Sequence, residues 1–209
     1  MQQDLFSYND DGSNAALPLP MEDADIVYYP DFLAADQAQD YFNRLLQTLS
    51  WRQEQIEVYG KRYTIPRLQA WYGDKEARYQ YSALSLHPLP WTPELSDLKN
   101  LCEQKSGVRF NSVLANLYRD GQDGMGMHAD DEKELGPQPV IASLSLGQVR
   151  TVVFSHKHSK QKVRLPLAAG SLLLMKGTTQ EYWLHGITKR KTPMAARINL
   201  TFRYIYPQK

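Results

Sequence analysis

The spacing of hydrophobic and polar positions changes about halfway along the 209-residue chain. Before that point, apolar residues recur every three or four positions in ADQAQDYFNRLLQTLSW and PELSDLKNLCEQKSG, which predicts two amphipathic helices. The first is expected over about residues 34–49, and the second should end near Gly107, because glycine commonly closes a helix. Between them, EQIEVYGKRYTIPRLQAWYG is rich in β-branched and aromatic residues, which predicts a β-hairpin with Gly60 in its turn.

After Gly107 the pattern is one of short strands at close spacing. The apolar runs are FNSVLANLYR, VIASLSLG, RTVVFSH, KVRLPLA, SLLLMKG, YWLHGI and ARINLTFRYIY. Turn residues separate most of them and no segment of helical length intervenes, which predicts an antiparallel sandwich or barrel. We therefore expect one compact, mainly β domain with flanking helices. Residues 1–20 should form a flexible arm, residues 21–107 the N-terminal helices, and residues 108–209 the β core.

Composition and charge narrow the class of protein. Hydrophobic residues make up 42 % and charged residues 22 % of the chain, as in ordinary globular proteins. A net charge of +1 means that any contact with nucleic acid must use local patches. The single cysteine, Cys102, excludes a disulfide framework and fits a reducing compartment. No leader segment and no apolar run near 18 residues is found, so we expect a cytoplasmic monomer without membrane attachment.

A candidate metal site begins in the stretch GMGMHADDEKEL. His128 and Asp130 are two positions apart, so their side chains point to the same side if the segment is extended. A third ligand must come from another strand, and four histidines are available for it: His87, His156, His158 and His185. His185 lies at the end of a predicted strand just before a glycine, whereas the other three fall in predicted loops or hairpin tips.

Two histidines and one carboxylate form the facial triad of non-haem Fe(II) oxygenases, which leaves coordination positions open for a co-substrate and O2. Mg²⁺ prefers more oxygen ligands, and structural zinc prefers a closed set of four ligands. A His-x-Asp pair is also common by chance on protein surfaces, so His128, Asp130 and His185 need support from elsewhere in the chain.

That support comes from the strict alternation of the last strand. Four polar residues share one face of it: Arg197, Asn199, Thr201 and Arg203. Such a polar face predicts a cavity, and its two arginines are suited to hold both ends of a small dicarboxylate, since guanidinium pairs bidentately with carboxylate. The alternative is an edge strand with two solvated arginines. In SVLANLYR, Asn116 and Tyr118 also share a face, which supports the cavity.

In this order and spacing, Asn116-x-Tyr118, His128-x-Asp130, His185 and RINLTFR resemble the signature of the AlkB family of Fe(II)/2-oxoglutarate dioxygenases. The resemblance covers about residues 28–206 and is strongest to the DNA-repair branch. It implies a double-stranded β-helix (jelly roll) core with an N-terminal nucleotide-recognition lid, and Fe(II), 2-oxoglutarate and O2 as cofactor and co-substrates. It implies iron ligands at His128, Asp130 and His185, and 2-oxoglutarate contacts at Asn116, Tyr118, Arg197, Asn199, Thr201 and Arg203.

The same resemblance implies a substrate. GKRYTIPRLQAWYGD and YSALSLHPLPW are similar to the lid of the repair branch, which acts on alkylated DNA bases of the 1-methyladenine and 3-methylcytosine type. Oxidative dealkylation would release formaldehyde, succinate and CO2. The implied substrate contacts are Tyr59, Arg67, Trp71, Tyr72, Tyr79, Tyr81, Ser82, Asp131 and Glu132. Among these, Tyr59 would be a wedge that fills the gap left by a flipped base, and the two acids would face a cationic base.

Several alternatives stay open at this stage. The triad alone does not separate single- from double-stranded DNA, or DNA from RNA, protein or lipid. A non-catalytic jelly-roll binding module would have lost a ligand or an arginine, and a metal-dependent hydrolase would not need the paired arginines. The basic clusters HKHSKQKVR and TKRKT fit contacts with phosphates. A DNA-repair role would place the protein at the nucleoid of a bacterium or in the nucleus of a eukaryote.

Overall fold

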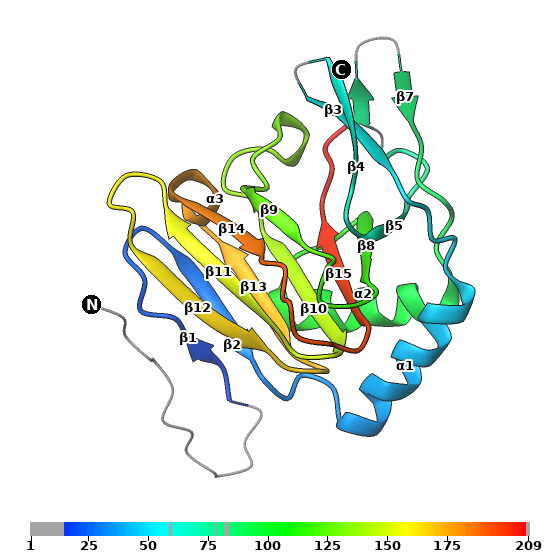
Figure 1. Cartoon of the computed structure of the whole chain (residues 1–209), viewed down its shortest axis with the longest axis horizontal. Coiled ribbons are helices and arrows are strands. Elements are labelled where there is room, and N and C mark those ends of the chain that lie inside the picture. The colour runs from blue at the N-terminus through cyan, green and yellow to red at the C-terminus, as the bar shows by residue number, and fades with distance from the viewer. Residues whose placement is uncertain (1–14, 59, 78, 82–83, 208–209) are drawn as a thin grey trace.

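The computed structural model describes residues 15–58, 60–77, 79–81 and 84–207. Two antiparallel sheets form a jelly-roll core (Figure 1). The larger sheet contains, in spatial order, β1 (Leu17–Pro18), β2 (Asp25–Tyr29), β13 (Leu172–Lys176), β10 (Ile141–Gly147), β15 (Arg197–Arg203), β8 (Ser112–Tyr118) and β5 (Leu68–Gly73). The smaller sheet contains β12 (Lys162–Leu167), β11 (Arg150–His156), β14 (Trp183–Ile187) and β9 (Met125–His128). The seven strands predicted after Gly107 are thus confirmed, and β9 is an additional strand.

β15 is a central strand of the larger sheet. It pairs with β10 along one side and with β8 along the other, so the alternative of a solvated edge strand is wrong. All seven of its residues are buried. Ile198, Leu200 and Phe202 belong to a hydrophobic cluster on the outer face of the sheet, while the four polar residues point between the two sheets.

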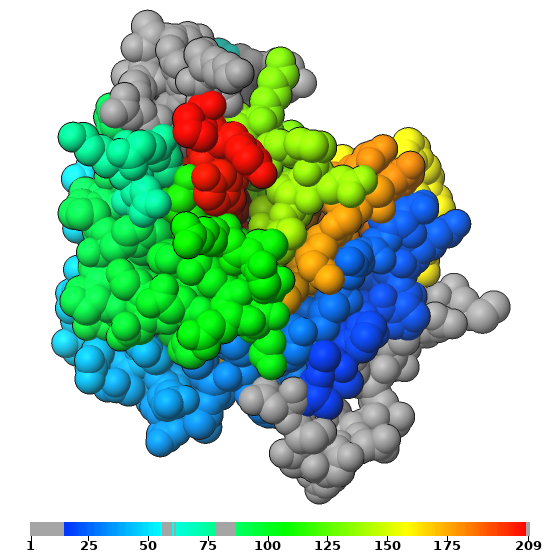
Figure 2. Space-filling model, turned by 180° about the vertical axis from the view of Figure 1, so that it is seen from behind, coloured from blue at the N-terminus to red at the C-terminus, as the bar shows by residue number. Residues whose placement is uncertain are grey.

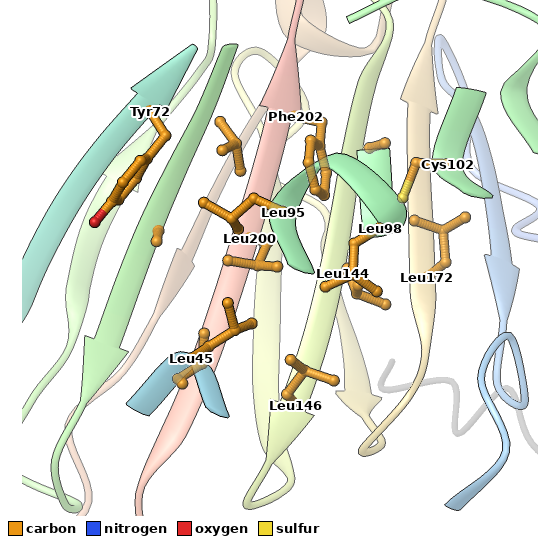
Figure 3. Close-up of a cluster of buried hydrophobic side chains, with 14 of the residues drawn as sticks. Leu45, Tyr72, Leu95, Leu98, Cys102, Leu144, Leu146, Leu172, Leu200 and Phe202 are labelled. Atoms are coloured by element: carbon orange, nitrogen blue, oxygen red, sulfur yellow. The ribbon is translucent and has the colours of Figure 1, made fainter. Parts of the chain in front are cut away.

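Two helices cover that outer face. Both were predicted: α1 spans Ala35–Thr48, and α2 spans Pro93–Ser106 and ends at Gly107, whose φ of 75° is readily adopted by glycine. In Figure 3, Leu95, Leu98 and Cys102 of α2 lie against the leucine-rich sheet face, and Figure 2 shows both helices from outside. Among the described residues, no helix combines the length and apolar character needed to cross a bilayer.

Two hairpins, together called the lid below, stand above the open end of the jelly roll (Figure 1). The first consists of β3 (Gln55–Val58) and β4 (Lys61–Thr64), with Gly60 in the turn at a φ of 73°, as the sequence predicted. The second consists of β6 (Tyr79–Tyr81) and β7 (Leu84–Leu86). Between them in sequence, β5 pairs with β8 and fixes this region to the larger sheet.

The N-terminal segment and one short helix differ from the prediction. Leu17 and Pro18 pair with β2, and Leu19 is buried, so the expected arm does not include these residues. β1, β2 and β5 extend the larger sheet with strands from before residue 108. The four-residue helix α3 (Thr179–Tyr182) is too short to produce a helical periodicity in the sequence.

Candidate active site

The three candidate metal ligands come together at the open end of the jelly roll. His128 ends β9 and lies opposite His185 of β14 in the strand pairing, with ring centroids 4.3 Å apart. Asp130 follows two residues after His128 and is buried. One ligand atom from each residue can be chosen so that all three lie within 4.8 Å of one another. The sequence prediction that these residues converge is therefore correct.

Their chemical states suit metal binding. Gly126 O lies 3.0 Å from Nδ1 of His128, so an Nδ1–H donor would leave Nε2 of this ring for a metal. Burial lowers the pKa of His185 to about 4, which keeps its imidazole neutral. For Asp130, burial by itself raises the pKa, but Arg203 and the two histidines outweigh it, so the pKa lies below its usual value and the carboxyl group is ionised.

The two carboxylate oxygens of Asp130 differ in their hydrogen bonding. Nη2 of Arg203 donates to its Oδ1, while Oδ2 is buried and has no hydrogen-bond partner among the described residues. A buried ionised oxygen without a partner is costly, and a metal ion between Oδ2 and the two imidazoles would satisfy it. The donor set of two imidazole nitrogens and one carboxylate therefore fits Fe(II).

The polar faces of β8 and β15 line the same narrow cavity as the metal ligands. The residues that face it from these strands are Asn116, Tyr118, Arg197, Asn199, Thr201 and Arg203. All six were expected to contact 2-oxoglutarate, and the structure brings all six together. All six are buried, so their polar groups have little contact with bulk water.

Arg197 is the cavity residue with the most unused hydrogen-bonding capacity. It is 1 % exposed, and Nη2 donates to Ser145 Oγ at 2.8 Å, but Nε and Nη1 have no acceptor among the described residues. Burial lowers the pKa of its guanidinium because the charge is removed from water. Its guanidinium lies over the Tyr118 ring at 5.2 Å, and Arg150 lies over the same ring at 5.6 Å. A ligand carboxylate would satisfy the two remaining donors.

Asn116 is held by two residues of the lid side. Nε of Arg67 donates to Asn116 Oδ1 at 2.7 Å, and Nε2 of Gln69 donates to the same oxygen at 3.0 Å. Both donors occupy the oxygen, so the amide nitrogen of Asn116 is the group left for a ligand. Arg67 is 8 % exposed and also donates to Gly124 O, and its expected contact with substrate stays a prediction.

The side chains of Asn199 and Thr201 form hydrogen bonds mainly with each other and with residues of the sheet. Nδ2 of Asn199 donates to Ser143 Oγ and Leu144 O, and Oδ1 accepts from Thr201 Oγ1. Their polar groups are therefore largely used inside the protein, which agrees with a supporting role beside the bound co-substrate.

The two acids expected to face the substrate differ in their surroundings. Oε2 of Glu132 is buried and has no hydrogen-bond partner among the described residues. Asp131 is exposed, and its Oδ2 lies 3.4 Å from Nζ of Lys157, which reduces the field that it can exert on a base. Of the two, Glu132 has the carboxylate oxygen that still lacks a partner.

Trp71 and Tyr72 lie on opposite sides of β5. Trp71 lines a second cavity, about 480 Å³ in volume, between the lid and the ends of β8 and β15, and its Nε1 donates to Ser112 Oγ at 2.8 Å. Tyr72 is 4 % exposed in the hydrophobic cluster under the helices, where its hydroxyl accepts from Ser50 N (Figure 3). The expectation that Tyr72 contacts substrate is wrong, because neighbouring side chains on a strand point to opposite faces.

The remaining expected contacts lie outside what the structure describes. Tyr59 and Ser82 are not among the described residues. Tyr79 and Tyr81 belong to β6, and their side chains lie outside the described part of the structure. Their expected contacts with substrate, and the wedge role of Tyr59, stay predictions.

The other histidines do not join the metal site. His156, expected at an exposed hairpin tip, is 5 % exposed, and its Nδ1 accepts from the backbone N–H groups of His158 and Ser159. Its Nε2 lies 3.3 Å from Asp23 Oδ2, so it ties the β11–β12 hairpin to the N-terminal segment. Within the described part of the chain, only His128, Asp130 and His185 form a group suited to a metal.

Sequence reasoning missed several supporting residues. Ser143 and Ser145 alternate with apolar residues in VIASLSLG, a signal that could have placed them on the cavity face. Gln180, which bonds to the backbone of Asp130, gave no such signal, because it lies in a short helix 50 residues away.

A jelly roll with a His-Asp-His group beside a buried arginine pair defines a 2-oxoglutarate- and Fe(II)-dependent oxygenase. The family model described as "2OG-Fe(II) oxygenase superfamily" matches residues 25–203. The solved structure titled "The structure of OsALKBH1" superposes with a TM-score of 0.60 at 16 % identity, covering 85 % of this chain and 97 % of that chain, which supports the fold.

Among curated proteins, the chain is 42 % identical to "DNA oxidative demethylase ALKBH2" of Mus musculus, over 85 % of this chain and 75 % of that protein. It is 46 % identical to the protein of the same name of Homo sapiens, over 72 % of this chain and 60 % of that protein. It is 40 % identical to "Alpha-ketoglutarate-dependent dioxygenase alkB homolog 3" of Homo sapiens, over 87 % of this chain and 66 % of that protein. The chain belongs to the AlkB family of 2-oxoglutarate/Fe(II) oxygenases, whose cofactor and co-substrates are Fe(II), 2-oxoglutarate and O2.

Proposed function

We propose that this protein removes alkyl groups from N-alkylated bases in DNA. The observation that carries the proposal is that Arg197, with two buried donors still open, lines the same cavity as the converging His128, Asp130 and His185. This pairs a carboxylate-binding group with a metal site, as oxidation with 2-oxoglutarate requires. The names of the relatives supply the substrate class, DNA.

His128, Asp130 and His185 would hold Fe(II), and Arg197 would bind the far carboxylate of 2-oxoglutarate. When bound, Fe(II) with 2-oxoglutarate and O2 supplies the oxidation that hydroxylates an N-methyl carbon, yielding succinate, CO2 and formaldehyde. The chain contributes placement and exclusion of water. Arg203 keeps Asp130 oriented through Oδ1, and Asn116 presents its amide nitrogen to the co-substrate, because Oδ1 is already held from the lid side.

The damaged base would enter from the lid side. A base in a duplex must leave the stack before its alkyl group can reach the metal. The cavity of about 480 Å³ under the lid is lined by Trp71 and shares Arg203 with the metal cavity, so it borders the reaction site. The unpartnered carboxylate oxygen of Glu132 favours a cationic base such as 1-methyladenine or 3-methylcytosine.

Positive charge for the DNA backbone would come from the loop that precedes β15. Lys189, Arg190 and Lys191 are all exposed there. Each phosphate contact by such a residue makes binding weaker as salt rises, so DNA affinity should fall with ionic strength. We also propose that residues 21–107 supply the lid, the helices and the strands β2 and β5, and that residues 108–209 supply the rest of the catalytic core of one compact monomer, acting where cellular DNA lies.

The test is incubation with Fe(II), 2-oxoglutarate and oligonucleotides that carry 1-methyladenine or 3-methylcytosine, in single- and double-stranded DNA and in RNA. We expect repaired base, formaldehyde and succinate, each dependent on 2-oxoglutarate. Succinate without repair on any oligonucleotide would assign the site to another substrate. An iron-loaded, folded sample that forms neither product would contradict the enzymatic function itself.

A further inference from the structure

A glutamine of the short helix α3 holds the backbone of the candidate metal ligand Asp130. The N–H of Asp130 donates to Oε1 of Gln180 at 2.9 Å, and both residues are buried, with Gln180 2 % exposed. Asp130 lies beyond the end of β9, so no strand ladder fixes its peptide. The side chain of Gln180 holds the backbone of Asp130, whereas the backbone of His128 is held by pairing with β14.

The orientation of the Gln180 amide is fixed by its second partner. Nε2 donates to Sδ of Met175 at 3.6 Å, a weak acceptor that cannot donate in return. The amide oxygen must therefore face the Asp130 N–H. The main chain of Gln180 is held as well, because Nζ of Lys157 donates to its carbonyl at 3.0 Å.

Two hydrogen bonds then define how the Asp130 carboxylate lies. Gln180 fixes the peptide, Arg203 binds Oδ1, and Oδ2 is left facing the histidines, 3.9 Å from Nε2 of His185. We propose that Gln180 is a positioning residue that aims Oδ2 of Asp130 at the metal. This inference rests on the proposed metal-binding role of Asp130, which the same experiment tests separately.

Lys157 connects Gln180 to Asp131, the residue that follows the metal ligand. Besides the Gln180 carbonyl, its Nζ lies 3.4 Å from Oδ2 of Asp131. The start of the loop that leads from the metal ligand to Glu132 is thus held from one side by Gln180 and Lys157. Removing the Gln180 oxygen should loosen Asp130 without removing any metal ligand.

The experiment measures Co(II) binding to the metal-free full-length chain through visible absorption, with no turnover involved. Gln180→Met keeps the length of the side chain but has no amide oxygen, and we expect its Co(II) affinity to fall about 10- to 100-fold, the range for lost outer contacts of metal ligands. Gln180→Glu keeps an oxygen at the same place and should restore most of the affinity. Gln180→Asn, which withdraws the amide by one methylene group, gives the same test if Gln180→Met does not fold.

Thr179→Val is the matched control. Thr179 lies in the same helix, is 1 % exposed, and bonds to Asp25 and Lys176 rather than to the site. It should lower the melting temperature but leave Co(II) affinity within about threefold of the parent, well inside the range expected for lost outer contacts. Parent-like Co(II) binding by folded Gln180→Met and Gln180→Asn, or an equal loss in Thr179→Val, would overturn the positioning role alone. Failure of the parent chain to bind Co(II) would instead overturn the metal site.

Discussion

Arg203 and Asp130 form a buried ion pair between the metal cavity and the cavity under the lid. Nη2 of Arg203 donates to Oδ1 of Asp130, and the arginine lines both the metal cavity and the cavity under the lid. The carboxylate that would bind iron is therefore held by the residue that separates it from the space proposed for the base. A change at either partner should affect metal binding and substrate placement together.

Asp130→Ala should abolish turnover and lower stability. The substitution removes a metal ligand and leaves Arg203 buried without its carboxylate, and breaking such a pair costs about 3 kcal/mol of unfolding free energy. Demethylation assays and urea unfolding would measure the two effects. Asp131→Ala is the control: its exposed carboxylate contributes little, so stability should change by less than about 1 kcal/mol. Residual turnover in Asp130→Ala would argue against its role as a ligand.

Arg197→Met should raise the KM for 2-oxoglutarate about 10- to 100-fold, because hydrogen bonds to a charged group are lost. The KM for DNA should change little, since Arg197 lies in the metal cavity and not in the cavity under the lid. Steady-state kinetics with each substrate varied in turn measures both values. Arg44→Ala, which removes an exposed arginine of α1 outside both cavities, should leave both unchanged. An equal rise in both KM values would contradict the assignment.

Glu132→Gln should change which lesions are repaired. The carboxylate favours a cationic base, so kcat/KM for 1-methyladenine should fall about tenfold, while that for the neutral base 3-methylthymine should be preserved. Competition between the two lesions in one reaction measures the ratio directly. A uniform loss on both lesions would indicate a general structural role for Glu132.

Tyr72→Phe should lower stability by about 1 kcal/mol and leave the KM for DNA unchanged, because only the hydrogen bond from Ser50 N to the hydroxyl is lost. Trp71→Ala should raise the KM for DNA, since it removes a wall of the cavity under the lid. Unfolding curves and kinetics on the same samples separate the two effects. A raised KM for DNA in Tyr72→Phe would mean that packing in the hydrophobic cluster affects how the lid binds DNA.

Tyr59→Ala should reduce repair of double-stranded DNA more than repair of single-stranded DNA, because a wedge is needed only where a flipped base leaves a gap. The ratio of the two rates is the measurement. Tyr63→Ala, an exposed tyrosine on β4 of the same hairpin, controls for loss of aromatic surface and should leave the ratio unchanged. Equal losses of repair on both substrates in Tyr59→Ala would contradict the wedge role of Tyr59.

The sequence by itself determined the features that depend on near neighbours along the chain. The 3.6-residue spacing placed α1, and the alternation of β15 separated Arg197 and Arg203 from Ile198 and Leu200, because periodicity records which face is buried. The spacing of His128 and Asp130 predicted two of the three metal ligands, since residues two apart on an extended segment point the same way.

Only the tertiary structure decided which partners those residues meet. Arg67 supports Asn116 across 49 residues, and Gln180 holds Asp130 across 50 residues. The sequence also did not show which face of β5 is core, so Trp71 and Tyr72 looked equivalent. Local periodicity carries no information about contacts between distant segments, because those depend on how the two sheets, the helices and the lid pack against one another.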